Sequence, residues 1–529
     1  MGFIIALILI AIAWYLLDRY LMSYWKRNGF KQLEPTFLLG HSKRLLAQTA
    51  SFYEVFDEFY YKSKGEKFIG MYNLYKPSLL VTDPHMIHDI FIKDFAYFHD
   101  HSIEFDTEHD PLAGFLFSLT GQKWRDLRVK LSPTFTAGKL RWMFPVMKQS
   151  SEVLVDFIQK GLDKNEPVFG FGELFRRYNA NLISSVAFGI DNDCINNPNN
   201  DFYIYGLKNF ENSFRNAIRQ FLFTFMPSLM SVFKVKFAPN DVDEFFMKIV
   251  REIVEYREKN NFSRNDFMDL LIQLKNQGYV SADKDDLDLD DEKEHIETEN
   301  IGTDQKTLKK LTFNELAAQA FVFYLAAFET NSAAMTFCLI ELARNPELQK
   351  KAQNEVDEVF QAFDVTYDAV KNLKYLEACM LEALRKYPPA PIHSRECTKD
   401  YKIPNTNLVI QKGTDIKVPI MSLHRDPEIY ENPHEFIPER FLDSPTGNSK
   451  LDDQKSAIFY SPFGDGPRHC IGMRMARASF KLIIAVLLSN FTFYLDDDRL
   501  YHEDVKFDTK SFPLRPDHDV RLKAVARKH

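Results

Sequence analysis

The chain has 529 residues, of which 45% are hydrophobic and 14% aromatic, so it can bury a large apolar core. Its formal net charge of -8 argues against a nucleic-acid-binding protein, because such proteins normally carry a basic domain. The five cysteines are odd in number and widely separated, which argues against a disulfide framework and favours a reducing compartment.

The first segment is strongly apolar. Every residue from Gly2 to Leu17 is apolar, and the basic residues Arg19, Lys26 and Arg27 follow the run. The positive-inside rule places the C-terminal side of such a helix in the cytosol. Because no small-residue cleavage site ends the run, we expect an uncleaved membrane anchor; a signal peptide or a buried helix are the alternatives.

The remaining chain is expected to form one domain. Residues 1–27 are assigned to the anchor and its flank, and residues 28–529 to a mainly helical domain with a small β region. An acidic surface loop is expected at about 281–310, where Asp283–Glu299 contains ten acidic residues and two lysines. An acidic binding tail is the alternative interpretation of this run.

Local signals place several elements. Thr312 and Glu315 have the spacing of a capping box and mark the start of a long apolar helix. Asn345–Phe360 has helical periodicity. Two β-hairpins are predicted, Phe68–Asp83 turning at Lys76-Pro77 and Leu408–Ile420 turning at Lys412-Gly413.

The segment Phe210–Phe233 is rich in phenylalanine. An amphipathic core helix explains most of this composition. A lipid-facing or substrate-channel surface is the alternative.

The sequence SPFGDGPRHCIG, Ser461–Gly472, carries the strongest chemical signal. It is a loop rich in glycine and proline that leads into a helix expected from about Ile471 to Ser489. Cys470 therefore lies near the positive end of a helix dipole, which favours the thiolate. A lone cysteine is more often a buried apolar residue, so the surrounding pattern must decide.

That pattern resembles the haem-binding loop of the cytochrome P-450 family. The matching positions are Phe463, Gly466, Arg468, Cys470 and Gly472. The resemblance implies the single-domain fold of that family, haem b as cofactor, and Cys470 as the thiolate ligand of the iron. It covers nearly the whole chain and is most similar to the insect microsomal branch that oxidises plant toxins and insecticides.

Other motifs agree with the family. Glu382 and Arg385 resemble its ExxR pair and Arg440, in PERF, the third member of a structural triad behind the haem. Residues that resemble its contacts to the haem propionates are Trp124, Arg128, Arg395 and Arg468. Each of these arginines alone would be an ordinary surface residue, but several planar donors suit two carboxylates.

The long apolar helix contains FYLAAFETNS, Phe323–Ser332. We expect the Thr330 hydroxyl to bond back to the carbonyl of Ala326 and distort the helix. Glu329 and Thr330 match the family's acid–alcohol pair, which relays protons to bound dioxygen. Ala327 stands where the family commonly has glycine.

The resemblance implies a monooxygenase that inserts one oxygen atom into a lipophilic small molecule. The electrons would come from NADPH through a membrane-bound reductase, with cytochrome b5 as a further candidate partner, at the cytosolic face of the endoplasmic reticulum membrane. Lys123, Arg125 and Lys130 are candidate docking charges; ordinary solvated surface residues are the equal alternative.

The substrate side is less defined. Phe117, Phe328 and Ile392 occupy positions that usually line the family's substrate pocket, and apolar lining suits a lipophilic substrate. The alternative functions are an endogenous hormone or fatty-acid hydroxylase, a haem-thiolate isomerase or dehydratase, and a carrier that binds hydrophobic ligands without converting them.

Overall fold

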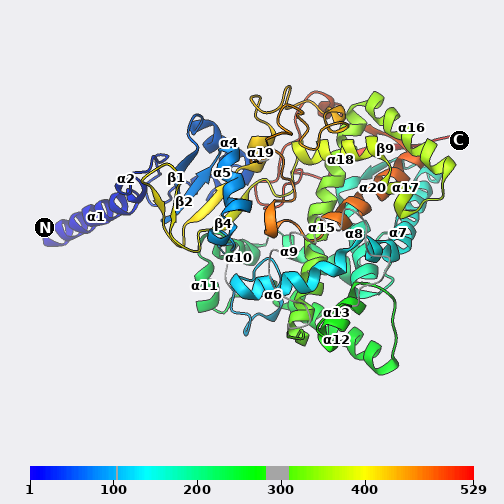
Figure 1. Ribbon diagram of the computed structural model, residues 1–529, viewed down its shortest axis with the longest axis horizontal. Coiled ribbons are helices and arrows are strands. Elements are labelled where there is room, and N and C mark those ends of the chain that lie inside the picture. The colour runs from blue at the N-terminus through cyan, green and yellow to red at the C-terminus, as the bar shows by residue number, and fades with distance from the viewer. Residues whose placement is uncertain (103–104, 212, 281–308, 455, 529) are drawn as a thin grey trace.

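The computed structural model describes residues 1–102, 105–211, 213–280, 309–454 and 456–528 (Figure 1). Its helices are α1 Gly2–Leu21, α2 Tyr24–Arg27, α3 Lys43–Leu46, α4 Phe52–Lys62, α5 Pro84–His88, α6 Gly121–Leu131, α7 Ala137–Asp163, α8 Phe171–Phe188, α9 Asp201–Phe210, α10 Phe214–Phe225, α11 Pro227–Val232, α12 Asn240–Asn260, α13 Phe267–Asn276, α15 Phe313–Arg344, α16 Pro346–Ala362, α17 Tyr367–Lys371, α18 Lys374–Lys386, α19 Ile420–His424 and α20 Met473–Asn490. Its strands are β1 Phe68–Asn73, β2 Lys76–Val81, β3 Val168–Gly170, β4 His393–Glu396, β5 Tyr401–Lys402, β6 Val409–Ile410, β7 Asp415–Val418, β8 Phe491–Leu495 and β9 Arg521–Ala526. The predicted class, mainly helical with a small β region, is confirmed; the predicted acidic loop lies almost wholly outside the described residues.

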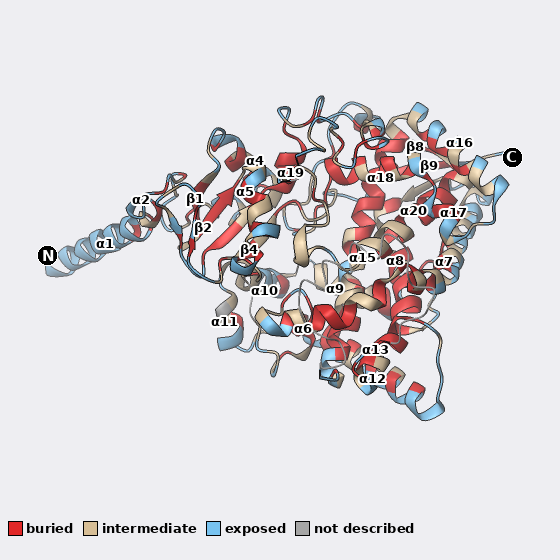
Figure 2. Ribbon diagram, in the orientation of Figure 1, coloured by how far each residue is buried: buried red, intermediate tan, exposed pale blue. Residues whose placement is uncertain are grey.

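The centre of the molecule is the 32-residue helix α15, which packs against α8, α18 and α20 (Figure 2). It begins with the predicted capping box, in which Thr312 and Glu315 bond reciprocally. Both α15 and α1 are long and apolar enough to cross a bilayer. However, 72% of the apolar window of α15 is buried inside the protein, compared with only 6% of that of α1. Helix α15 is therefore a core helix.

Helix α1 instead projects alone from one end of the molecule (Figure 1). The segment directly after it is already part of the folded body. Trp25 in α2 is buried, and its indole N–H donates to the carbonyl of Met71 in β1 at 2.9 Å. The flank of the anchor is thus fixed to the first sheet.

The first predicted hairpin is correct in its strands and wrong in its turn. Strands β1 and β2 pair antiparallel, with Asn73 opposite Lys76, so the turn lies at Leu74-Tyr75. Leu74 adopts a φ of 52°, the left-handed conformation that lets two residues reverse the chain. Pro77 is accommodated inside β2, which removes one donor from the first sheet.

The second predicted hairpin is wrong. Strand β6 pairs with β5 in a two-stranded sheet, whereas β7 lies between β2 and β4 in the first sheet. The chain does turn at Gly413, whose φ is 85°, but the turn joins strands of different sheets. Alternation in the sequence could not reveal that β7 pairs with β4 on one side and with β2, much earlier in the chain, on the other.

The phenylalanine-rich segment packs at the surface of the body and is not a buried core helix, since Asn216 is the only buried residue of α10 in the part of the chain that the structure describes. Its residues form α10 and α11, and Phe223 packs on Phe105 and Phe237 with ring centroids 6.0 and 5.8 Å away. Phe214 and Phe233, by contrast, are 81% and 67% exposed. One side of the segment packs on the body and the other forms an apolar surface.

Candidate functional site

The cysteine loop is built as its sequence predicts. The Cys470 amide donates to the carbonyl of Phe463 at 2.8 Å, closing the loop, and α20 begins at Met473. Gly466 has a φ of 67°, and a Cβ there would collide with the backbone carbonyl of Phe91. Cys470 therefore lies just before the positive end of an 18-residue helix.

Cys470 differs from the other cysteines in its exposure. It is exposed, whereas Cys194, Cys338, Cys379 and Cys397 are buried. A Cβ added to Gly472 would meet no atom within 4 Å. Burial raises the pKa of the Cys194 and Cys397 thiols to about 12, so these two are held in the neutral form. The position of Cys470 is the one that suits a thiolate ligand.

Helix α15 presents an open face beside this loop. The Thr330 hydroxyl donates to the carbonyl of Ala326 at 2.6 Å, which confirms the predicted backward bond. Ala326 is exposed, although most of α15 is buried. The adjacent Asn331 side chain donates to the Ser479 hydroxyl of α20 at 3.1 Å, which ties this part of α15 to the helix that follows Cys470.

Glu329 lies on another side of the same helix. It is buried, and its Oε1 pairs with Arg515 at 3.0 Å and with Arg176 at 3.7 Å. Arg515 also pairs with Asp508 at 2.7 Å. Sequence reasoning missed both arginines, since they come from α8 and the C-terminal segment and no local pattern connects them to Glu329. The two members of the acid–alcohol pair are therefore held by different partners.

Buried cations gather next to the cysteine loop. Removal from water lowers the pKa of Arg395 to about 10 and that of Arg468 to about 9. The Arg395 Nε has no hydrogen-bond partner within the described part of the chain. Burial, and then the charges of these two arginines, hold the pKa of His101 well below its usual range. His101 was not predicted from the sequence.

Helix α6 joins this group. Trp124 is buried beneath the Arg468 guanidinium, which lies 4.1 Å from its ring centroid. Arg128 donates to the carbonyl of His469 at 3.0 Å and contacts its ring nitrogen at 3.1 Å. The four predicted propionate contacts thus surround the cysteine loop, with Arg395 supplied by β4.

Their surroundings fit an anionic group. A buried arginine whose pKa is lowered by removal from water is stabilised strongly by a carboxylate that binds to it. Arg468 donates to the carbonyls of His99 and Leu119 and pairs with Asp100 at 3.2 Å. Arg128, Arg395 and Arg468 would hold the carboxylates of a haem bound at Cys470.

The three residues predicted as a triad contact one another, with Glu382 and Arg385 buried and Arg440 half-buried. Arg385 contacts the Glu382 carboxylate at 2.7 and 2.9 Å, and Arg440 lies 3.4 Å from the same carboxylate. Arg385 also donates to the carbonyl of His424, whose Nε2 accepts the Ser461 amide at 3.0 Å. The network therefore supports the first residue of the cysteine loop.

The three predicted pocket residues do not lie together. Phe117 is 49% exposed and stacks on His101 at 4.2 Å. Phe328 has no exposed area and packs with Tyr324 and Phe210. It precedes Thr330 by two residues, which is roughly 200° around the helix, so its side chain points into the core. The prediction that Phe328 lines an open pocket is wrong.

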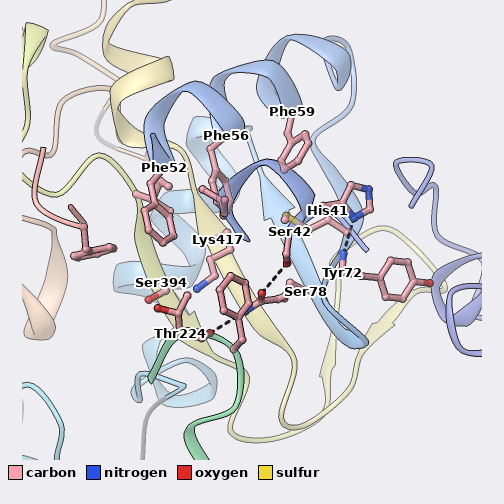
Figure 3. A pocket seen from close by; sticks show the side chains of 16 residues that line it. His41, Ser42, Phe52, Phe56, Phe59, Tyr72, Ser78, Thr224, Ser394 and Lys417 are labelled. Carbon is pink, nitrogen blue, oxygen red and sulfur yellow. Dashed lines mark hydrogen bonds between the residues drawn. The ribbon is translucent and has the colours of Figure 1, made fainter. Parts of the chain in front are cut away.

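Ile392 lines a different pocket, between α4, the first sheet and the end of α10 (Figure 3). Phe52, Phe56 and Lys417 line the same pocket. Ser394 also faces it, whereas its neighbour Arg395 reaches the ring of Phe91. Strand β4 thus separates this pocket from the cation group.

The fold and the cysteine site define a haem-thiolate protein, and the comparisons agree. Residues 32–516 match the family model described as Cytochrome P450. The chain is 36% identical to "Probable cytochrome P450 6d5" of Drosophila melanogaster, over 97% of each chain. It is 37% identical to "Cytochrome P450 6A1" of Musca domestica, over 90% of this chain and 88% of the relative.

The chain belongs to the cytochrome P450 family, and its insect relatives confirm the predicted branch. It is a haem-thiolate monooxygenase that takes electrons from NADPH through a reductase. Thiolate ligation at Cys470 would supply electron density that favours cleavage of the O–O bond. Phe463, Arg468, Trp124, Arg128 and Arg395 would hold the haem around that ligand.

Proposed function

We propose that the enzyme oxidises foreign lipophilic molecules such as plant toxins or insecticides at the endoplasmic reticulum membrane. The observation that carries the proposal is the exposed Cys470 just before α20, flanked by buried arginines. The names of the insect relatives support the assignment to this branch. Hydroxylation of a hormone or fatty acid is the second candidate within the same chemistry.

The proposed proton route uses two side chains of α15. Thr330 holds a proton at Oγ1, shared with the Ala326 carbonyl, on the open face of the helix. Glu329 pairs with Arg515 at 3.0 Å and with Arg176 at 3.7 Å. After leaving these partners it would take up a proton from solvent water and pass that proton to the site. Phe117, beside the cation group, is the remaining candidate to line the substrate pocket there.

The proposed membrane arrangement places α1 across the bilayer and the enzyme body in the cytosol. Helix α1 has 20 residues, about 30 Å at 1.5 Å per residue, the thickness of a hydrocarbon core. Arg19, Lys26 and Arg27 follow its apolar part and favour the cytosolic side. Membrane lipid is thus a proposed partner, and cytochrome b5 a proposed second electron donor.

Turnover under ¹⁸O₂ tests the proposed reaction. With reductase, NADPH and a panel of insecticides and plant toxins, one labelled atom should enter the product. Conversion of a lipid hydroperoxide without NADPH would instead favour the isomerase or dehydratase. Tight binding of every ligand with no product would favour the carrier and contradict the proposal.

A further inference from the structure

The pocket between α4, the first sheet and the end of α10 has a polar end and an apolar wall (Figure 3). Its volume is about 80 Å³. A single water molecule needs roughly 10–15 Å³ of such space, so the pocket can hold a short chain of heavy atoms. Strand β4 lies between this pocket and the cation group beside Cys470, so a ligand here would be bound apart from the cysteine site.

Most of the wall is apolar. Phe52 and Phe56 come from α4, and Ile392 comes from the residue before β4. The Asn73 side-chain amide donates to the carbonyl of Thr224 at 3.0 Å, which holds the end of α10 against the first sheet. A lining of this kind favours a lipophilic ligand.

Lys417 of β7 and Ser394 of β4 form the polar end. They stand directly opposite each other in the antiparallel pair of these strands, so their side chains leave the sheet on the same face. Figure 3 shows both across the pocket from Phe52 and Phe56. The polar end therefore presents an ammonium group and a hydroxyl group side by side.

The charge of Lys417 is already balanced. Its Nζ lies 3.0 Å from Oδ2 of the buried Asp415, its only acidic partner within the described part of the chain. The ammonium has three N–H donors, so this one contact leaves others for a ligand. A carboxylate ligand would bring a second negative charge to a single lysine, which is costly away from water.

A neutral acceptor avoids that cost. A carbonyl oxygen has two lone pairs, which suits two adjacent donors, and a bond from an ammonium is stronger than one between neutral groups. An amide would also bring an N–H that needs its own acceptor. An ester brings acceptors only, which matches an end that presents donors.

We infer that this pocket binds a neutral, lipophilic carboxylic ester, whose carbonyl oxygen accepts from Lys417 and Ser394 while its hydrocarbon part packs on Phe52 and Phe56. The inference goes beyond the proposed function, because the ester is held on the other side of β4 from the cation group and is not converted there.

Photoaffinity labelling of the full-length holoenzyme tests the inference. The probe is methyl hexanoate with a diazirine near the end of its chain, and the comparison probes are the free acid and a hexane with the same diazirine. Mass spectrometry of the digested protein locates the capture. The ester should label α4 or the end of α10 several-fold more than either comparison probe.

Variants test the two donors. Lys417→Met and Ser394→Ala should each lower labelling by the ester several-fold, whereas Lys417→Arg, which keeps charged donors, should retain most of it. Lys402→Met removes an exposed lysine from β5 and is the matched control, which should label as the wild type does. If Lys417→Met fails to fold because Asp415 loses its partner, Ser394→Ala decides.

Equal labelling of these segments by the ester, the acid and the hydrocarbon would overturn the inference, as would labelling unchanged in Ser394→Ala. Stronger labelling by the acid would overturn the neutral ligand. The carbon monoxide difference spectrum separates this result from the proposed function. An intact spectrum without capture in the pocket would overturn the ester site and leave the oxidase chemistry standing, whereas a wild type without the red-shifted band would contradict only the proposed function.

Discussion

The Glu382–Arg385 pair is the most completely buried ion pair near the site, with neither side chain exposed. Two contacts join its charges, and Arg385 gains two backbone carbonyls as further acceptors. Breaking such a pair leaves a buried charge uncompensated, which costs about 3–5 kcal/mol.

We therefore expect Arg385→Ala to lower the free energy of unfolding by about 3–5 kcal/mol and to lower haem retention with it. Urea denaturation of the holoprotein measures the first quantity. Lys62→Ala, which removes an exposed i,i+4 pair with Glu58, should cost under about 1 kcal/mol. Arg385→Lys, which keeps the charge but loses the two-pronged contact, should fall between them. Equal losses for the three variants would contradict the structural role of Arg385.

Thr330→Ala should divert electrons from product to hydrogen peroxide several-fold, since the hydroxyl on the open face of α15 is removed. Peroxide and product measured against NADPH consumption give this ratio. Thr336→Ala is a matched control, because its hydroxyl makes the same backward bond, to Ser332 at 2.7 Å, within the buried part of the helix. If both variants released the same excess of peroxide, the effect would come from helix distortion and not from a proton route.

At the scale of elements, α6 connects the site to the surface. Its buried side holds Trp124 and Arg128, and Lys123 is exposed. Lys130, predicted as a docking charge, is buried, and burial lowers its pKa. The docking hypothesis is therefore reduced to Lys123 and the half-buried Arg125.

Reversing these two charges, Lys123→Glu with Arg125→Glu, should slow reductase-supported turnover several-fold and leave peroxide-supported turnover intact. The reason is that only the first reaction needs electrostatic docking of a partner. Lys350→Glu on α16 supplies the control for a change of net charge at a distance. Equal loss of both activities in the double variant would show that α6 is disturbed and would sink the docking hypothesis.

Helices were predictable from the sequence because their signals are local. The capping box at Thr312 and the loop before Met473 gave the starts of α15 and α20 to within two residues. The strands were less predictable, since β7 pairs not only with β4 but also with β2, which lies far from it in the chain. Pairing partners of that kind leave no periodic trace.

The site divides in the same way. Where both partners lie on one helix, the sequence predicted the contact, as with the Glu382–Arg385 pair. His101, Arg176 and Arg515 were missed, because each reaches the site from a separate segment and is ordinary in its own sequence context. The prediction for Phe328 was wrong because this residue, two positions before Thr330, lies on the other side of α15 and its side chain is buried in the core.

At the scale of the whole molecule, one arrangement explains the main observations. The core helix α15 is tied to α20, which follows the cysteine loop, arginines from α6, β4 and the loop gather beside Cys470, and α1 projects from one end of the molecule (Figure 1). The chemistry argued for this arrangement depends on a thiolate at Cys470 that binds haem iron.

The carbon monoxide difference spectrum of the reduced, membrane-expressed protein, recorded beside Cys470→Ser, tests that claim most directly. We expect a red-shifted Soret band in the wild type that is absent in the variant. Haem bound by the wild type without the shift, or a shift that persists in Cys470→Ser, would show that Cys470 is not the ligand.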